Sequence, residues 1–155
     1  MSSILRPPVD PALAQALAKM GMGGLDFRTK EDLERLRQWS NLDISAVLHG
    51  ARADAIEHEE REIPGHEGAG VLTVSIFRPK KKKRSRSDTP GIFYVHGGGL
   101  CAGNRFLGIS HALEWVDAFG AVCVTMEYRL APEHPQPAQV EDCYAALKWM
   151  SERLL

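Results

Sequence analysis

The sequence lacks several features that would mark other classes of protein. Its three cysteines, Cys101, Cys123 and Cys143, include no C-x-x-C pair, which argues against a disulfide framework and a zinc site. No apolar run approaches the roughly 20 residues that span a bilayer, and the N-terminus lacks the apolar stretch of a secretory signal. Nineteen Lys and Arg residues nearly balance twenty Asp and Glu residues, so no strong field attracts nucleic acid. We therefore expect a soluble cytoplasmic protein without a membrane span or nucleic-acid partner.

Helical signals come first along the chain of 155 residues. Asp10 and Pro11 suit the cap and first turn of one helix. Thr29 with Asp32 suits the start of a second helix that runs to Trp39. Residues 43–54 allow a third short helix. Because these helices precede every strand, residues 1–55 are interpreted as a helical cap segment and residues 56–155 as a core.

The core has the predicted order β-β-β-α-β-α. The elements are strands at residues 58–64, 71–77, 91–95 and 121–126 and helices at residues 109–119 and 139–154. The last two strands are apolar without alternation, as in strands buried on both faces of a sheet. This order predicts an α/β fold, a three-layer sandwich with parallel central strands.

A basic run, Lys80–Arg86, separates the second strand from the third. It is interpreted as a solvated loop. A nuclear address or a nucleic-acid patch is the alternative, which the acidic run at residues 57–62 weakens.

Chemistry is suggested by His96 and the three glycines that follow it, Gly97, Gly98 and Gly99, directly after a buried strand. Glycines can take a positive φ and turn backbone N–H groups toward a bound group. At the carboxyl end of a parallel strand such a loop faces the ligand crevice, where it can form an oxyanion hole. A phosphate loop is disfavoured because no Lys-Ser or Lys-Thr follows; a simple tight turn is the remaining alternative.

A second motif follows the last strand, EYRLAPEHPQPAQVEDCYAALKWM. With the glycine motif, it resembles the hormone-sensitive-lipase-like branch of the α/β-hydrolases, a family of carboxylic ester hydrolases. The resemblance extends from about residue 9 to the end of the chain. The matching residues of the second motif are Tyr128, Arg129, Leu130, Ala131, Pro132, Glu133, His134, Pro135, Pro137, Ala138, Asp142 and Trp149. Two positions depart from the family: Leu100 replaces a more usual aromatic residue, and Gln136 replaces a more usual Phe.

The resemblance implies a serine esterase acting on a small ester, with no metal and no organic cofactor. It assigns the oxyanion hole to Gly97, Gly98 and Gly99. His96 is expected to fix the glycine loop, and neither His96 nor His134 is expected to be the catalytic base. The other residues expected to support the loops are Tyr128, Arg129, Glu133 and Asp142, the last three as a buried polar network.

The family's nucleophile stands in a G-D-S-A-G elbow that follows the helix at residues 139–154, and its acid and histidine come later. None of the triad is present in this sequence. Ser110 in Gly108–Ala112 follows no strand and lacks the final glycine, so we expect it to be a helix N-cap. Each cysteine is interpreted as buried; a thiol nucleophile at Cys101 beside His96 has no local signature.

The chain is therefore expected to supply the oxyanion-hole half of an α/β-hydrolase fold truncated before the nucleophile elbow, and to be inactive alone. A catalytically inactive fragment that binds a ligand or a partner is the alternative. By the same resemblance, the strand at residues 92–95 would have an unpaired edge, which favours self-association and marginal stability.

Overall fold

A computed structural model describes residues 8–19, 29–81, 85 and 88–154. The chain divides into two compact units, residues 1–34 and 35–155, and each unit is described by itself. Within the described residues, no helix combines the length and the apolar character needed to cross a membrane.

The first two helices begin where their capping residues predict. In α1, Pro11–Lys19, the Asp10 carboxylate accepts the Ala12 N–H at 2.8 Å. In α2, Lys30–Ser40, the Thr29 hydroxyl accepts the Asp32 N–H at 3.1 Å and donates to the Asp32 carboxylate at 2.7 Å. These reciprocal bonds satisfy donors that the first helical turn leaves unpaired.

The third predicted helix is divided into two short pieces. A 3₁₀ turn, η1, covers Ile44–Ala46 and is capped by the Asp43 carboxylate, and α3 covers Gly50–Ala55. Gly50 takes a positive φ of 53°, which interrupts a continuous helix at this point. The predicted boundary between cap segment and core at residue 55 stays a prediction.

The four predicted strands are present and form one mixed sheet in the order β1-β2-β4-β3. The strands are β1 Ile56–Pro64, β2 Val71–Pro79, β3 Gly91–Tyr94 and β4 Val122–Met126. β1 and β2 form an antiparallel hairpin, and β2 also pairs antiparallel with β4. Only β3 and β4 pair in parallel. The expected parallel pairing of these two strands is therefore confirmed, but the pair is not central, because β3 lies at the edge and β2 lies between β1 and β4.

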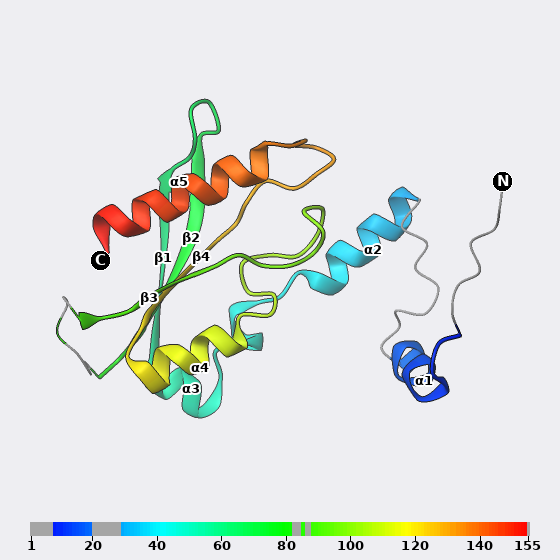
Figure 1. Ribbon diagram of the computed structural model, residues 1–155, viewed down its shortest axis with the longest axis horizontal. Helices are drawn as coiled ribbons and strands as arrows, with labels where there is room; N and C mark the ends of the chain where they lie inside the picture. The colour runs from blue at the N-terminus through cyan, green and yellow to red at the C-terminus, as the bar shows by residue number, and fades with distance from the viewer. Residues whose placement is uncertain (1–7, 20–28, 82–84, 86–87, 155) are drawn as a thin grey trace. The chain divides into compact units, whose positions relative to one another are not determined.

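Helices cover both faces of this sheet (Figure 1), so the three-layer α/β arrangement is confirmed. On one face, α5, Ala138–Arg153, packs its Ala146 and Met150 on a cluster built from β2 and β4. On the other face, α4, Ser110–Phe119, packs its Leu113 and Val116 on a second cluster. The side chains of β4 face both layers and are all buried.

Two local expectations are corrected. β3 was expected to be buried on both faces, but its Ile92, Phe93 and Tyr94 are only half-buried, while its place at the edge of the sheet agrees with the unpaired edge that the resemblance implies. Ser110 was expected to cap α4, but Ile109 occupies the cap and Ser110 is the first helical residue. The preceding turn is fixed by Gly108, with φ 76° and a backbone so close to Tyr94 that a Cβ would lie 2.6 Å from its hydroxyl.

Candidate active site

The glycine loop follows β3 at the carboxyl end of the parallel pair β3–β4. Gly98 and Gly99 have φ angles of 122° and 62°. The Gly98 carbonyl accepts the N–H groups of Cys101 at 3.2 Å and Ala102 at 3.1 Å. A Cβ on Gly98 would lie 2.0 Å from the Ala102 carbonyl oxygen. This turn therefore requires glycine at position 98, both for its φ and for the space.

The three glycine N–H groups are available to a bound group. Among the described residues, no acceptor is recorded for the N–H groups of Gly97, Gly98 and Gly99. Gly97 and Gly99 are exposed, and Gly98 is half-buried. Preorganised N–H donors of this kind can stabilise an oxygen that becomes negatively charged. The role of these groups as an oxyanion hole stays a prediction from the sequence.

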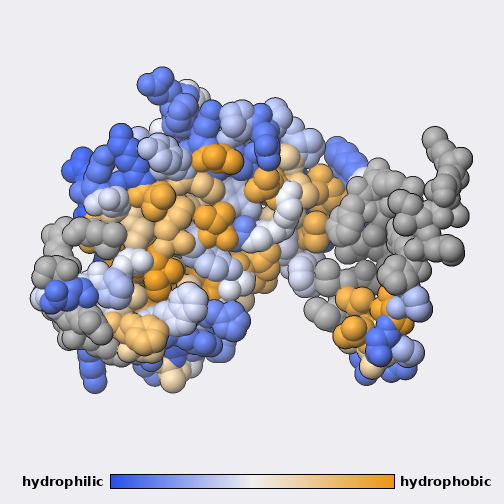
Figure 2. Space-filling model, in the orientation of Figure 1, coloured by the Kyte–Doolittle hydropathy of each residue, from blue (hydrophilic) through white to orange (hydrophobic). Residues whose placement is uncertain are grey.

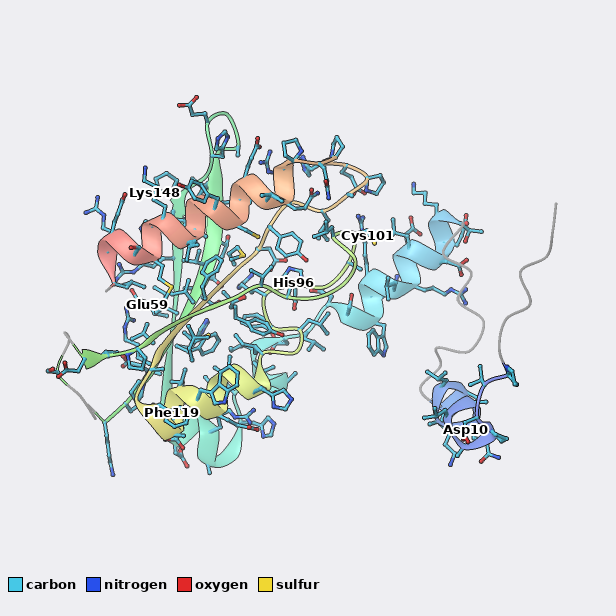
Figure 3. All side chains as sticks on the ribbon, in the orientation of Figure 1. Asp10, Glu59, His96, Cys101, Phe119 and Lys148 are labelled. Carbon is cyan, nitrogen blue, oxygen red and sulfur yellow. The ribbon has the colours of Figure 1, made fainter. Side chains whose placement is uncertain are left out.

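His96 forms a hydrogen bond with the carbonyl group of Gly97, the first glycine of the loop. Its Nδ1 lies 2.8 Å from the Gly97 carbonyl oxygen, so Nδ1 carries the proton in this contact. The ring stacks on Tyr128, with centroids 4.1 Å apart, and the Tyr128 hydroxyl donates to the His96 carbonyl at 2.9 Å. Burial lowers the pKa of His96 and raises that of Tyr128 to about 12. Both rings are therefore neutral at pH 7, and they brace the loop. Figure 3 labels His96 and Cys101 on the segment between β3 and α4.

Arg129 and Asp142 connect the end of β4 to α5. The Asp142 side chain is fully buried and accepts the Arg129 backbone N–H at 2.9 Å. Both of its oxygens also accept the Arg129 guanidinium, at 2.8 to 3.1 Å. The hydrogen bond with Asp142 raises the pKa of Arg129. The structure thus brings together two of the three residues expected in the polar network, and of the two only Asp142 is fully buried.

Glu133 does not join that network. Its carboxylate is exposed and pairs with Arg37 of α2 through two hydrogen bonds, of 2.9 and 2.7 Å. The Arg37 hydrogen bond is the largest cause that lowers the pKa of Glu133, to about 2. Arg37 also donates to the carbonyls of Cys101 and Ala131, at 2.8 Å each. Sequence patterns gave no signal for Arg37, because a charged residue on a short helix is expected to be solvated.

Two further residues near the end of α2 contact the same loop. The Ser40 hydroxyl accepts the Gly103 N–H at 2.9 Å and donates to the Leu36 carbonyl at 2.7 Å. The Asn104 amide donates to the Asn41 side chain at 2.8 Å. Ser40 and Asn104 are buried polar residues, and buried polar groups need partners. Sequence spacing gives no indication that Ser40 bonds Gly103 or that Asn104 bonds Asn41.

A serine–histidine contact occurs elsewhere, between Ser75 and His58, whose Oγ and Nε2 atoms are 2.9 Å apart. Ser75 is completely buried in β2, and its oxygen also accepts the Arg105 Nε–H at 2.9 Å. Arg105 pairs in addition with Glu127 at 3.1 Å and with Glu60. Because no substrate reaches a fully buried hydroxyl, this contact belongs to a structural ion-pair network.

A cavity of about 830 Å³ lies beside these loops. Its lining includes Arg37, Asn41, Asn104, Arg105, Glu127 and Glu133. Charges of both signs face it, so it shows no preference for one ionic ligand. The part of the chain that the structure describes holds no group of three or more His, Cys, Asp or Glu side chains arranged for a metal ion.

The cysteines differ in burial. Cys123 is buried in β4, where burial raises its thiol pKa to about 12. Cys101 and Cys143 are half-buried. The Cys101 thiol donates to the Gly98 carbonyl at 3.4 Å, so it is part of the glycine turn. Most of the basic run Lys80–Arg86 lies outside the described residues.

Comparison with known proteins agrees with this geometry. Residues 92–154 match the family described as alpha/beta hydrolase fold. A solved bacterial heroin esterase superposes with a TM-score of 0.70 at 28% identity, covering 93% of this chain and 43% of that one. The chain belongs to the α/β-hydrolase fold family. This membership confirms the family and fold class predicted from the sequence.

The α/β-hydrolase relatives include carboxylesterases. The chain is 32% identical to carboxylesterase NlhH of Mycobacterium tuberculosis over 156 aligned positions, which cover 97% of this chain and 44% of that protein. An esterase of Pyrobaculum calidifontis superposes with a TM-score of 0.66 at 30% identity, covering 95% of this chain and 44% of the other. The chain thus spans less than half the length of these relatives.

Proposed function

We propose that this chain contributes the oxyanion hole of a carboxylic ester hydrolase of the serine esterase type. The observation that carries the proposal is that the N–H groups of Gly97, Gly98 and Gly99, at the carboxyl end of β3, have no hydrogen-bond acceptor within the part of the chain that the structure describes. The carboxylesterase relatives support it. The cytoplasmic location, the ester substrate and the lack of a nucleic-acid partner stay predictions from the sequence.

In the proposed reaction, a serine outside these residues attacks the ester carbonyl. The carbonyl oxygen becomes negatively charged and accepts the glycine N–H groups, while a histidine takes the serine proton and an acid orients that histidine. His96 is not assigned the role of base, because its unprotonated Nε2 is buried away from any bound group and burial lowers its pKa. Its role is to fix the loop, together with Tyr128, Arg129, Glu133 and Asp142.

The first experiment incubates the 155-residue chain with a short-chain nitrophenyl ester and with a serine-reactive fluorophosphonate probe. We expect neither turnover nor labelling, since an oxyanion hole without a nucleophile gives only a small residual rate. A labelled serine, such as Ser110, would contradict the assignment of this chain to the oxyanion-hole half.

A second experiment tests the glycine donors directly. The chain is fused to the C-terminal remainder of carboxylesterase NlhH, and ester hydrolysis is measured before and after Gly98→Ala. Alanine keeps the N–H of residue 98, but its Cβ would lie 2.0 Å from the Ala102 carbonyl oxygen, so the turn must shift and misplace the donor. An oxyanion donor that no longer reaches its acceptor lowers kcat by about 10²–10³-fold. Gly68→Ala is the matched control, because Gly68 also has a positive φ (80°) but lies in the β1–β2 turn. Equal loss in both variants would contradict the role of Gly98.

We also propose self-association through the free edge of β3. In the parallel ladder the Val122 N–H donates to the Pro90 carbonyl at 2.9 Å. Because alternate residues of a parallel strand face opposite neighbours, the backbone groups of Gly91, Phe93 and Val95 face away from β4. Figure 2 shows apolar residues on the face between α5 and α4, where β3 runs in Figure 1. An apolar edge of this kind favours pairing with another chain.

Analytical ultracentrifugation over a range of concentrations tests this association. We expect Val95→Lys to lower the association constant by about tenfold or more, because a charged side chain on an edge strand disfavours pairing with another chain. The matched control is Val71→Lys, since Val71 is also an exposed valine, at the start of β2. A monomeric chain that unfolds cooperatively would contradict the proposal.

A further inference from the structure

The end of α2 contacts the glycine loop at its far side. We name the contacts of Arg37, Ser40 and Asn41 with residues 101–104 the α2 clamp. Arg37 donates to the Cys101 carbonyl at 2.8 Å, and Ser40 accepts the Gly103 N–H at 2.9 Å. The clamp therefore binds the backbone of the loop at two points, one through a carbonyl and one through an N–H.

Arg37 also joins this loop to the loop after β4. The two loops share one backbone hydrogen bond, from the Ala131 N–H to the Leu100 carbonyl at 2.9 Å. Next to it, the Arg37 guanidinium bridges the carbonyls of Cys101 and Ala131. Two carbonyl groups cannot hydrogen-bond to each other, because both are acceptors. The planar arginine guanidinium has several N–H groups and can donate to both. Glu133 compensates the positive charge.

The residues held by the clamp contact the carbonyl groups of the glycine loop, and each of these carbonyls shares a peptide plane with the next N–H donor. The Cys101 N–H is bonded to the Gly98 carbonyl, so that the turn moves as one unit with Cys101. Gly103 packs against the start of the loop, where a Cβ would lie 2.6 Å from the Gly97 carbonyl oxygen. A displacement of residues 101–103 therefore reorients the N–H groups of Gly98 and Gly99.

We propose that Arg37 is a positioning residue of the esterase reaction, which sets the direction of the oxyanion N–H donors by holding the Cys101 and Ala131 carbonyls together. The proposal rests on the oxyanion role proposed above for the glycine loop. Through Arg37, the last turn of α2 in the predicted cap segment is coupled to the oxyanion hole. Catalytic donors need to be placed within about 0.5 Å, so a small movement of this turn changes the rate.

Hydrogen exchange of the 155-residue chain tests the clamp without relying on catalysis. Mass spectrometry follows a peptide spanning residues 97–104, in which the N–H groups of Cys101, Ala102 and Gly103 are hydrogen-bonded. We expect Arg37→Gln to speed exchange there by about tenfold, the equivalent of one lost hydrogen bond. Exchange in β4 is the internal reference, and its rate should stay unchanged.

Arg78→Gln is the matched control. Arg78 resembles Arg37 in exposure, at 26% against 29%, and in its pairing with a carboxylate, that of Glu59. Arg37→Lys keeps the charge but loses the planar fork, so it should restore little of the protection. Equal effects of Arg37→Gln and Arg78→Gln, or faster exchange throughout the chain, would overturn the proposal.

The fusion protein with the NlhH remainder separates positioning from binding. Arg37→Gln should lower kcat by about tenfold or more with little change in KM, because a misplaced donor weakens only the transition state. A change in KM alone would overturn the positioning role. If the unsubstituted fusion is folded but inactive, the proposed function fails, while the exchange experiment still decides whether Arg37 holds the loop.

Discussion

Two arginine–carboxylate pairs hold the segment that follows β4, and they differ in burial. Arg129 and Asp142 meet at a carboxylate that is fully buried, with the Arg129 backbone N–H as an additional donor. Arg37 and Glu133 meet at a carboxylate whose side chain is 56% exposed. The first pair connects residues 13 apart along the chain, and the second connects residues 96 apart.

The difference indicates two separate tasks. A buried pair is costly to break, because removing one partner leaves an uncompensated charge. An exposed pair contributes little stability by itself. Arg37 therefore acts mainly by fixing the positions of the two carbonyl groups to which its guanidinium donates. Arg129 fixes the start of the loop, and Arg37 sets how the glycine loop lies against it.

The largest expected effect is that of Asp142→Ala, which should lower the free energy of unfolding by about 3 kcal/mol. It removes the acceptor of both the Arg129 guanidinium and the Arg129 backbone N–H. Denaturant unfolding measures the loss. Glu133→Ala should cost far less, and similar losses in the two variants would remove the distinction between the pairs.

Tyr128→Phe should have an intermediate effect. It deletes the hydroxyl that donates to the His96 carbonyl at 2.9 Å and leaves that buried residue without this bond. The expected loss is about 1–2 kcal/mol, measured by the same unfolding experiment. Tyr144→Phe on α5 is the control, because Tyr144 is 65% exposed, and it should leave stability unchanged.

The exposed pair should also show a defined pH dependence. Arg37 is the main cause that lowers the pKa of Glu133 from its usual 4.5 to about 2 in the folded chain. A lowered carboxyl pKa stabilises the folded state above pH 4.5, and this contribution disappears as pH falls through about 2. The stability difference between the unsubstituted chain and Glu133→Gln should shrink across this window. A difference that persists at the acidic end would show that Glu133 acts through packing.

Salt should have the smallest effect. At about 1 M salt the Debye length falls to about 3 Å, which screens exposed charges far more than buried ones. The stability change caused by Glu133→Gln should therefore diminish in high salt, while that caused by Asp142→Ala should remain. An equal salt response would mean that water reaches both pairs.

Local signals predicted most of the fold. Asp10 and Thr29 mark the starts of α1 and α2, and the apolar runs before Gly97 and Glu127 mark β3 and β4. The glycine loop could be identified from the sequence because His96 and the three glycines are adjacent along the chain. The partial exposure of β3 was not predicted, because an apolar run does not reveal how much of each face the neighbouring elements cover.

The sequence by itself determined the elements, the family and the candidate oxyanion donors, since each depends on residues close together along the chain. Only the tertiary structure decided that Arg37 bridges Cys101 and Ala131, that Ser40 binds Gly103, and that Glu133 leaves the buried network. These contacts join residues more than 60 positions apart. Their geometry exists only once β3 and β4 lie side by side and bring their following loops within reach of the end of α2.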